Sequence, residues 1–319
     1  MKLDEKSIQA KAIQEGFSGG YFLNDIDISN EFQEFYNDYL NTDNRADLHY
    51  LENTEVKFEP SKIFPGVKSI GLFPFPYYNL DVEQKLKESK YRIARYAWGR
   101  DYHKALKSKL KIACANQGKF RIVCDSTPLP ERYLAKKAMG ESAFIGRNGM
   151  LIDKKQGSYF LLAFVLFERE LTPVVGNSTP VAAPKSETVN FREFEECGQC
   201  RKCIQACPGK ALHGDGTLLS SQCFSYWSTA NRSPEVKLKA AKSGWVFGCD
   251  ICQEVCPYNK EPVTTSDPDF SARAAAVEIS QGRLDFKESQ LYGTVFQRLQ
   301  KTLLQRNKDY VDFSTSFLD

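Results

Sequence analysis

Helix-like and strand-like patterns of hydrophobic residues alternate over residues 1–172. Residues 4–15 and Glu31–Leu40 carry apolar side chains at the spacing of amphipathic helices, and the first of these helices is expected to end near Gly16. Residues Val67–Phe73 follow a Pro-Gly pair and precede a proline-rich turn, as a strand bounded by turn signals does. Strands that alternate with helices predict an α/β or α+β domain.

The pattern continues with one more helix and two more strands. Residues Tyr102–Ala113 repeat the helical spacing. Residues Phe120–Cys124 predict a short apolar strand that stops at Asp125, and a polar residue at a strand end is a candidate functional group. Residues Ser158–Phe167 are apolar enough to form a strand that is buried on both faces.

The composition indicates a protein with a substantial core. Hydrophobic residues make up 42% of the 319 residues and aromatic residues 13%. The apolar stretch Gln156–Phe167 is shorter than the roughly 20 residues of a membrane span, so no membrane association is expected. The net charge is +3, but Lys85–Lys111 holds ten Lys or Arg residues against Glu88 and Asp101. Such a stretch can bind phosphate, or it can form a solvated helix face.

Eight of the ten cysteines fall into two groups. The first group begins at Cys197 with the spacing C-x2-C-x2-C-x3-C-P, the run that holds cubane clusters in bacterial ferredoxins. The second repeats C-x2-C-x3-C-P and has its additional thiol upstream. In two-cluster ferredoxins the fourth cysteine of such a run binds the other cluster. The sequence therefore predicts two 4Fe-4S clusters, one on Cys197, Cys200, Cys203 and Cys256 and one on Cys207, Cys223, Cys249 and Cys252.

Zinc and disulfides are the competing interpretations of these cysteines. Two C-x2-C pairs can hold zinc, but a zinc site has no use for the third thiol of each run or for the proline after its last cysteine. Disulfides belong to exported chains, and residues 1–17 lack the apolar core of a signal peptide. A cytoplasmic location is therefore expected. Cys114 and Cys124 lie in apolar surroundings and are expected to be buried core residues.

The cysteine groups divide the rest of the chain. Residues 1–172 are expected to form the first domain, and a stretch rich in Pro, Ser and Thr predicts a linker at 173–189. The cluster domain is expected at 190–260, followed by a short helical region at 261–319. The best helix of that region is Val295–Arg306, with Arg298, Lys301 and Arg306 on its polar side.

Clusters of this kind pass single electrons, so the domain before them should hold a group that performs two-electron chemistry. The sequence has no G-x-G-x-x-G after a strand and no P-loop, so NAD or ATP binding is not predicted. The three histidines, His49, His103 and His213, do not pair at metal-binding spacing. Each is expected to be a surface or hydrogen-bonded residue.

Segments in both domains resemble the epoxyqueuosine reductase family, in the order in which they occur in that family, over residues 10–310. They are FPGVKSI (Phe64–Ile70), RYAWGRDYH (Arg95–His103), DSTPLPER (Asp125–Arg132), IGRN (Ile145–Asn148), QGSYFLL (Gln156–Leu162), CGQC and CDICQEVCPYN. The resemblance implies a cobalamin-binding, nitroreductase-like α/β domain, followed by a ferredoxin-like domain with two 4Fe-4S clusters. The HEAT-type repeats of many relatives would be absent or vestigial in this chain.

The implied activity is the reduction of epoxyqueuosine to queuosine at the wobble position of the tRNA anticodon, the last step of queuosine synthesis. The reductant would be cob(I)alamin, which the two clusters supply with electrons. Removal of the epoxide oxygen takes two electrons and two protons, and the resemblance assigns Asp125 as the proton donor. To be protonated at neutral pH, this residue needs a pKa raised by burial well above about 3.9.

The resemblance also carries cobalamin contacts over to this sequence. The matching positions are Lys57, Asp125, Leu151, Asp153, Leu162, Ser225, Gly248 and Asp250. For the two leucines the alternative is ordinary core packing. The chain departs from the family's Gly-Trp-x-Gly-Lys-Asn motif at Phe144 and Arg147, after an insertion at Glu141 and Ser142.

The expected partners are a tRNA anticodon arm and an external low-potential electron donor of the flavodoxin or ferredoxin class. The cluster domain, Lys85–Lys111 and Val295–Arg306 would bind the tRNA. The chain is expected to be a monomer. Two other functions fit the same residues: a cobalamin-dependent reductive dehalogenase-like enzyme, and a non-catalytic electron-transfer iron-sulfur protein.

Overall fold

The computed structural model describes residues 3–171, 194–231, 243–285, 287–299 and 301–315. The predicted linker at 173–189 lies outside the described residues. No helix in the described ranges is both long enough and apolar enough to cross a membrane.

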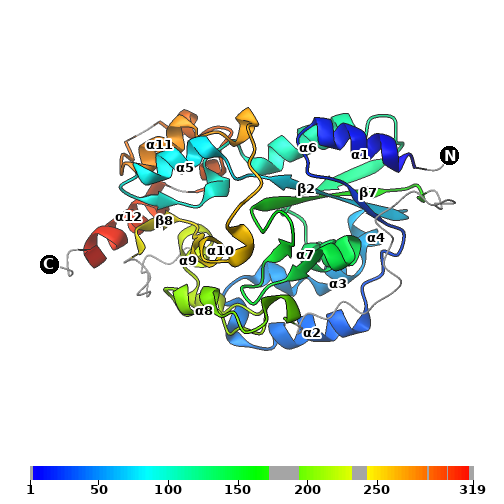
Figure 1. Ribbon diagram of the computed structural model, residues 1–319, viewed down its shortest axis with the longest axis horizontal. Coiled ribbons are helices and arrows are strands. Elements are labelled where there is room, and N and C mark those ends of the chain that lie inside the picture. Colours follow the sequence, from blue (N-terminus) through cyan, green and yellow to red (C-terminus); the bar gives the residue numbers. More distant parts are fainter. Residues whose placement is uncertain (1–2, 172–193, 232–242, 286, 300, 316–319) are drawn as a thin grey trace.

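A four-stranded sheet lies at the centre of the first domain, in the order β1-β2-β7-β4 (Figure 1). The strands are β1 (Tyr21–Leu23), β2 (Ser69–Pro76), β7 (Phe160–Phe167) and β4 (Phe120–Val123). All three pairings are antiparallel, and β2 and β7 pair along their whole length, from Ser69 opposite Phe167 to Pro76 opposite Phe160. The predicted mixed fold is confirmed, and its antiparallel sheet makes it α+β.

Side chains of successive strand residues point to opposite faces of the sheet. Both faces of this sheet are covered and form separate cores. On one face, residues such as Phe73 and Val165 pack in a core with α1 (Glu5–Gln14) and α6 (Tyr102–Ala113). On the other face, Leu72 and Phe164 pack in a second core with the helices below the sheet in Figure 1. Those helices are α2 (Asn30–Leu40), α3 (Thr54–Phe58), α4 (Pro60–Ile63) and α7 (Glu131–Met139).

The sequence pattern located these elements closely. Helix α6 has the predicted bounds, while α1 and α2 differ from their predictions by one residue at one or both ends. Side chains cap their first turns, since Asp4, Ser29 and Asp101 each accept a hydrogen bond from a backbone N–H. A short hairpin of β5 (Ala143–Ile145) and β6 (Leu151–Asp153) lies beside α7.

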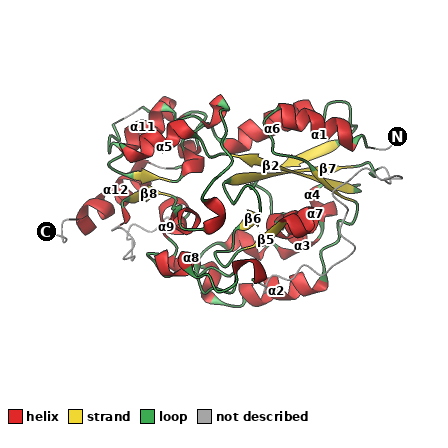
Figure 2. Cartoon of the chain, in the orientation of Figure 1, coloured by secondary structure: helices red, strands yellow, loops and turns green. Residues whose placement is uncertain are grey.

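The cysteine-rich region is built of short elements and joins the first domain through a parallel strand pair. Its helices are α8 (Lys202–Ala206), α9 (Phe224–Thr229) and α10 (Ile251–Glu254). Strand β3 (Arg92–Ile93) of the first domain pairs with β8 (Trp245–Phe247), which leads into Cys249. Figure 2 shows this pair between the α5 and α9 helices, where α5 is Leu80–Lys87.

The C-terminal region packs against the first domain. Phe270 stacks on Phe75 with ring centroids 4.6 Å apart. The Asp101 N–H donates to the Gly293 carbonyl at 2.7 Å. A side chain at Gly99 would meet the Asp269 carbonyl at 2.4 Å, so only glycine fits this crossing. Residues beyond 260 therefore belong to the same core as the sheet.

The predicted helix Val295–Arg306 is wrong in its extent. A 3-10 turn occupies Val295–Arg298, and α12 runs from Lys301 to Thr315 after α11 (Ala274–Ser280). Arg306 is also misplaced by the prediction, because its guanidinium donates to the carbonyls of Trp227 and Asn231 in the cysteine-rich region. Helix α12 therefore packs against that region through the half-buried Arg306.

Several basic side chains of the stretch Lys85–Lys111 form ion pairs with acidic residues. Arg92 pairs with Glu254, Arg100 with Asp269 at 3.2 Å and Lys109 with Asp267 at 2.6 Å. Arg95 is buried in an acidic network. Much of the positive charge thus fastens later parts of the chain to the first domain.

Candidate functional site

Asp125 lies two residues past the end of β4, as the strand pattern predicted. Its φ angle is +54°, a value that is uncommon for a residue with a side chain. The N–H of Asp125 donates to Glu131 Oε1 at 2.8 Å, which holds the loop to the start of α7. The Asp125 side chain remains 63% exposed. The turn therefore presents a carboxylate to whatever binds beside the sheet edge.

Two side chains from the start of α6 contact this carboxylate. The Tyr102 hydroxyl donates to Asp125 Oδ2 at 2.5 Å, and His103 Nε2 lies 3.5 Å from the same oxygen. The hydrogen bond with His103, and then the hydrogen bond from Tyr102, lower the pKa of Asp125. The sequence argument required a raised pKa, so in this structure the shift has the opposite direction.

His103 is held from its other side by Asp101. The distance from His103 Nδ1 to Asp101 Oδ1 is 2.7 Å, and both residues are buried. Burial opposes the charged imidazolium, but the hydrogen bonds to Asp101 and Asp125 outweigh it and raise the pKa of His103. The expectation that His103 is a hydrogen-bonded residue is confirmed. Its place beside Asp125 was not foreseen, although both lie in segments that carry the family resemblance.

The C-terminal region supplies the outer part of this network. Arg298 Nη2 donates to Asp101 Oδ2 at 3.1 Å, and its Nη1 lies 3.4 Å from His103 Nε2. Arg298 lies 197 residues after Asp101 in the sequence. The sequence placed Arg298 on a polar helix face, so this contact was missed.

Glu131 and Lys57 form the other side of the Asp125 loop. Burial, and then the charge of Asp125, raises the pKa of Glu131 to about 8. Burial lowers the pKa of Lys57 to about 8, and its ammonium lies 5.0 Å from the centre of the Tyr36 ring. Two neighbouring carboxyl groups whose pKa values are pushed apart are characteristic of acid–base sites. Sequence reasoning missed Glu131, although it lies in the DSTPLPER segment.

Asp250 is a buried anion between the two cluster cysteines Cys249 and Cys252. It accepts hydrogen bonds from the Arg95 N–H at 2.8 Å and from Arg95 Nη1 at 3.2 Å. Burial, partly offset by Arg95, raises the pKa of Asp250 to about 6. The ring of the half-buried Tyr96 lies 5.9 Å from that of Tyr102, which binds Asp125, and 6.2 Å from that of Phe247 in β8. Tyr96 thus lies between the cysteine-rich region and the Asp125 loop.

The other positions proposed for cobalamin lie in different elements. Leu151 is buried in β6, while Leu162 in β7 is half-buried opposite Pro74. Asp153 Oδ1 accepts the N–H groups of Lys155 and Gln156 at 2.7 and 3.1 Å. The side chains of Asp153 and Asp250 are therefore already paired. The remaining two positions are Ser225, in α9, and Gly248, which has a φ of +63° and follows β8.

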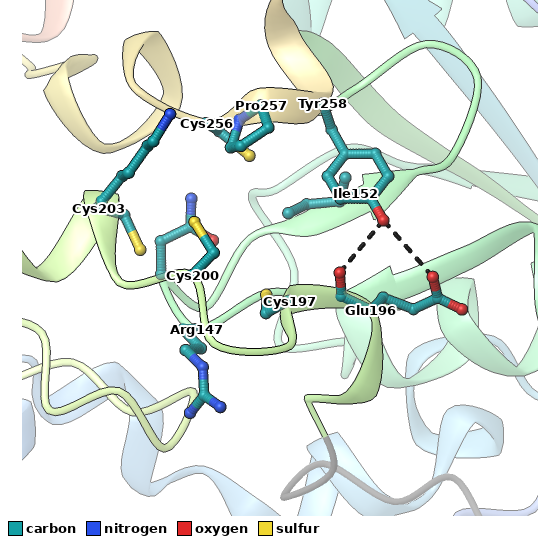
Figure 3. Close-up of a pocket in the computed structure, with 11 residues that line it drawn as sticks. Arg147, Ile152, Glu196, Cys197, Cys200, Cys203, Cys256, Pro257 and Tyr258 are labelled. Carbon is teal, nitrogen blue, oxygen red and sulfur yellow. Dashed lines mark hydrogen bonds between the residues drawn. The ribbon is translucent and has the colours of Figure 1, made fainter.

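The four thiols of the first predicted set line one cavity of about 310 Å³ (Figure 3). The cavity is closed by residues of both domains, and its lining includes Cys197, Cys200, Cys203, Cys256, Arg147, Ile152 and Tyr258. Burial raises the pKa of the Cys203 thiol, and the charges of the other three cysteines raise it further. The four thiols of this set therefore lie together in the fold, and their role as ligands of one cluster stays a prediction.

The second predicted set is also a spatial group. Burial raises the pKa of Cys252 far above its usual range, and Cys249, Cys223 and Cys207 add to this shift. No three His, Cys, Asp or Glu side chains in the described ranges are arranged to hold a single metal ion. A zinc ion needs its thiolates at about 2.3 Å from one point. Four thiols that line one cavity, as those of the first set do, suit a larger group such as a cubane cluster.

The two remaining cysteines are inert core residues, as predicted. Cys114 and Cys124 are fully buried. Burial raises the pKa of each thiol to about 12, so neither is a thiolate at neutral pH.

The fold and the two sets of thiols define an iron-sulfur protein with an α+β domain in front of its clusters. Family models agree with this class: one described as 4Fe-4S double cluster binding domain matches residues 196–259. A second, described as epoxyqueuosine reductase QueG, DUF1730, matches residues 57–126.

Similar proteins are named epoxyqueuosine reductase. The one from Atelocyanobacterium thalassa is 34% identical over 70% of this chain and 68% of its own length. The one from Cyclobacterium marinum is 31% identical over 85% of this chain and 82% of its own length. The chain belongs to the epoxyqueuosine reductase family.

Solved structures show the same fold. The epoxyqueuosine reductase of Streptococcus thermophilus matches with a TM-score of 0.75 at 23% identity, over 98% of this chain and 81% of that one. A crystal structure of epoxyqueuosine reductase with an epoxyqueuosine-modified tRNA-Tyr stem loop matches with a TM-score of 0.70 at 22% identity, over 96% of this chain and 80% of that one.

Proposed function

We propose that this chain reduces epoxyqueuosine to queuosine in the anticodon of tRNA, with Asp125 as the proton donor. Family membership supports the reaction. The observation that carries the site assignment is the exposed Asp125 carboxylate, which is held by buried partners at the sheet edge. The ring of Tyr96 contacts Tyr102, which binds Asp125, and also Phe247 of β8, which leads into Cys249.

Cobalamin is the group that we propose to bind between these regions. When bound, it would supply a strongly reducing cobalt centre for the two-electron step. Lys57 is a buried ammonium beside the Asp125 loop, and such a group suits the amide or phosphate oxygens that cobalamin carries. Leu162 offers a half-buried apolar surface. Asp153 and Asp250 could contribute through backbone groups, since their carboxylates are already paired.

The proton is the part of the reaction that the chain itself handles. Loss of the epoxide oxygen as water consumes two electrons and two protons, and the first proton must reach the oxygen as the carbon–oxygen bond breaks. Asp125 has a lowered pKa, so it needs a source of protons at neutral pH. His103 has a raised pKa and its Nε2 lies 3.5 Å from Asp125 Oδ2, so we propose it as the group that returns a proton to the carboxylate. Tyr102 fixes the orientation of Asp125.

The remaining expectations belong to the same proposal. The chain would act as a monomer in the cytoplasm and receive electrons from an external low-potential donor of the flavodoxin or ferredoxin class. The anticodon arm would approach Asp125, because that carboxylate is exposed. The paired charges of Arg92, Arg100 and Lys109 leave a smaller basic surface for this contact than the sequence suggested.

The test is an assay on tRNA that carries epoxyqueuosine, after anaerobic reconstitution with iron, sulfide and cobalamin. We expect Asp125→Asn to lower the turnover rate by roughly 10²–10⁴-fold, the usual contribution of a positioned acid. Asp25→Asn, at an exposed carboxylate that pairs with Lys137, is the matched control and should leave the rate unchanged. Full turnover by the Asp125→Asn variant would remove this residue from the mechanism.

Two results would favour the other candidate functions. Release of chloride from halogenated substrates without any tRNA turnover would indicate a reductive dehalogenase. Absence of corrin bands in the visible spectrum after reconstitution would indicate a pure electron-transfer protein. Elemental analysis that finds about eight iron atoms and one cobalt atom per chain would support the proposed cofactors.

A further inference from the structure

Arg147 connects the first domain to the loop that carries the first two cluster cysteines. It lies in the turn between β5 and β6. Its Nη1 donates to the Gly214 carbonyl at 2.8 Å, and its Nη2 donates to the Gly198 carbonyl at 3.2 Å. Gly198 directly follows Cys197 and has a φ of +49°, so the guanidinium fixes a turn that determines where this thiol points.

The same residue lines the cavity of the four thiols. Figure 3 shows Arg147 at the edge of this cavity, near Cys197 and Cys200. Its Nε is buried and has no hydrogen-bond partner within the described part of the chain. Buried donors are nearly always paired, so an unpaired one in a cavity wall indicates that a group is to be bound there.

Among the described residues that line the cavity, Arg147 and Lys202 are the basic ones. The Phe194 ring lies 5.0 Å from the Arg147 guanidinium on one side. Lys202 lines the same cavity but is exposed, so water screens its charge. Lys154 is paired with Glu196 at 2.5 Å.

We propose that Arg147 is a positioning residue that raises the reduction potential of the cluster on Cys197, Cys200, Cys203 and Cys256. A cubane with four thiolates is anionic and becomes more negative when it accepts an electron. A fixed, partly buried cation beside it stabilises the reduced form, and hydrogen bonds to the sulfurs have the same effect. The inference rests on the cluster assignment and does not depend on the substrate.

The test is a redox titration of the anaerobic holoprotein, followed by electron paramagnetic resonance at both clusters. We expect Arg147→Gln to lower the ratio of reduced to oxidised first cluster at least tenfold at a fixed potential, a midpoint shift of about 59 mV for one electron. The second cluster should keep its midpoint and serves as the internal reference. Arg147→Lys keeps the charge and should retain most of the wild-type potential.

Lys202→Gln is the matched control, because it removes an exposed cation from the same cavity. It should shift the first midpoint by much less than Arg147→Gln does. An unchanged midpoint in Arg147→Gln with full iron content would overturn the proposal. If Arg147→Gln loses iron from the first cluster, the midpoint potential of Arg147→Lys is decisive. A midpoint near the wild-type value supports the role of charge, and a midpoint lower by about 59 mV or more contradicts it. If the midpoint shifts as expected but the protein shows no activity on the tRNA, this inference holds and the proposed function does not.

Discussion

The cysteine-rich region and the Asp125 site are assembled from the chain in different ways. All eight candidate cluster ligands lie between Cys197 and Cys256, and their spacing together with the ferredoxin pattern predicts two sets. The Asp125 network takes Asp101 and His103 from the start of α6, Glu131 from α7 and Arg298 from near the C-terminus. A site whose ligands are fixed by local spacing can be inferred from a motif, whereas a hydrogen-bonded site depends on how distant segments pack.

The largest expected effect comes from breaking the cysteine sets. Cys252→Ala and Cys207→Ala should each lose one cluster, so that iron falls from about eight to about four per chain, and both should abolish turnover. Both variants should retain the first cluster, because Cys207 and Cys252 belong to the same set of neighbouring thiols. Iron analysis and electron paramagnetic resonance spectra check this result.

Cys203→Ala sharpens the experiment, since it lies only four residues from Cys207 but groups with Cys256. It should lose the other cluster and leave a different spectrum. Identical spectra for Cys203→Ala and Cys207→Ala would show that neighbouring cysteines share one cluster, and the swapped pairing would be wrong.

The next largest effect concerns the ion pairs between the first domain and the cysteine-rich region. Arg95 is 8% exposed and pairs with Asp250 at 3.2 Å and Glu254 at 2.8 Å. Arg95→Gln would leave Asp250, which is 2% exposed, without its cation. We expect a loss of about 3–5 kcal/mol in unfolding free energy, since removal of one partner strands a buried charge. Thermal unfolding under anaerobic conditions provides the measurement.

Arg283→Gln is the control for this change, because Arg283 forms a solvent-exposed ion pair with Glu278. Exposed pairs contribute at most about 1 kcal/mol. If the two variants unfold at the same temperature, the Arg95 network does not hold the cysteine-rich region to the first domain.

The sequence predicted those features that depend on neighbouring residues. Helix α6 follows from the spacing of its apolar residues and a capping aspartate, and the thiol sets follow from their motifs. Val295–Arg306 was predicted as one helix because its apolar residues have helical spacing, yet the chain turns near Leu299 to pack on the first domain. The direction of the Asp125 pKa shift was also out of reach, since His103 and Tyr102 determine it through space.

The smallest effect tests whether His103 and its aspartates form an ion pair. The pKa of His103 is raised above 6.5, so its contribution to stability is complete below that pH and is lost as the pH rises through the raised value. The pKa values of Asp101 and Asp125 are lowered below 3.8, so their contribution is present above that pH and is lost in more acidic solution. The pair is therefore most stabilising between these two limits.

His103→Gln should cost roughly 1–3 kcal/mol near pH 6, the penalty for unpairing a buried acceptor. The cost should be smaller at pH 9, because the contribution of a group with a raised pKa is lost as the pH rises. Thermal unfolding at both pH values measures the difference. His49→Gln is the control, because the His49 side chain is 73% exposed and its replacement should change the stability little. An equal loss at pH 6 and pH 9 would mean that His103 acts as a neutral hydrogen-bonding group. It would then not be the imidazolium from which Asp125 regains its proton.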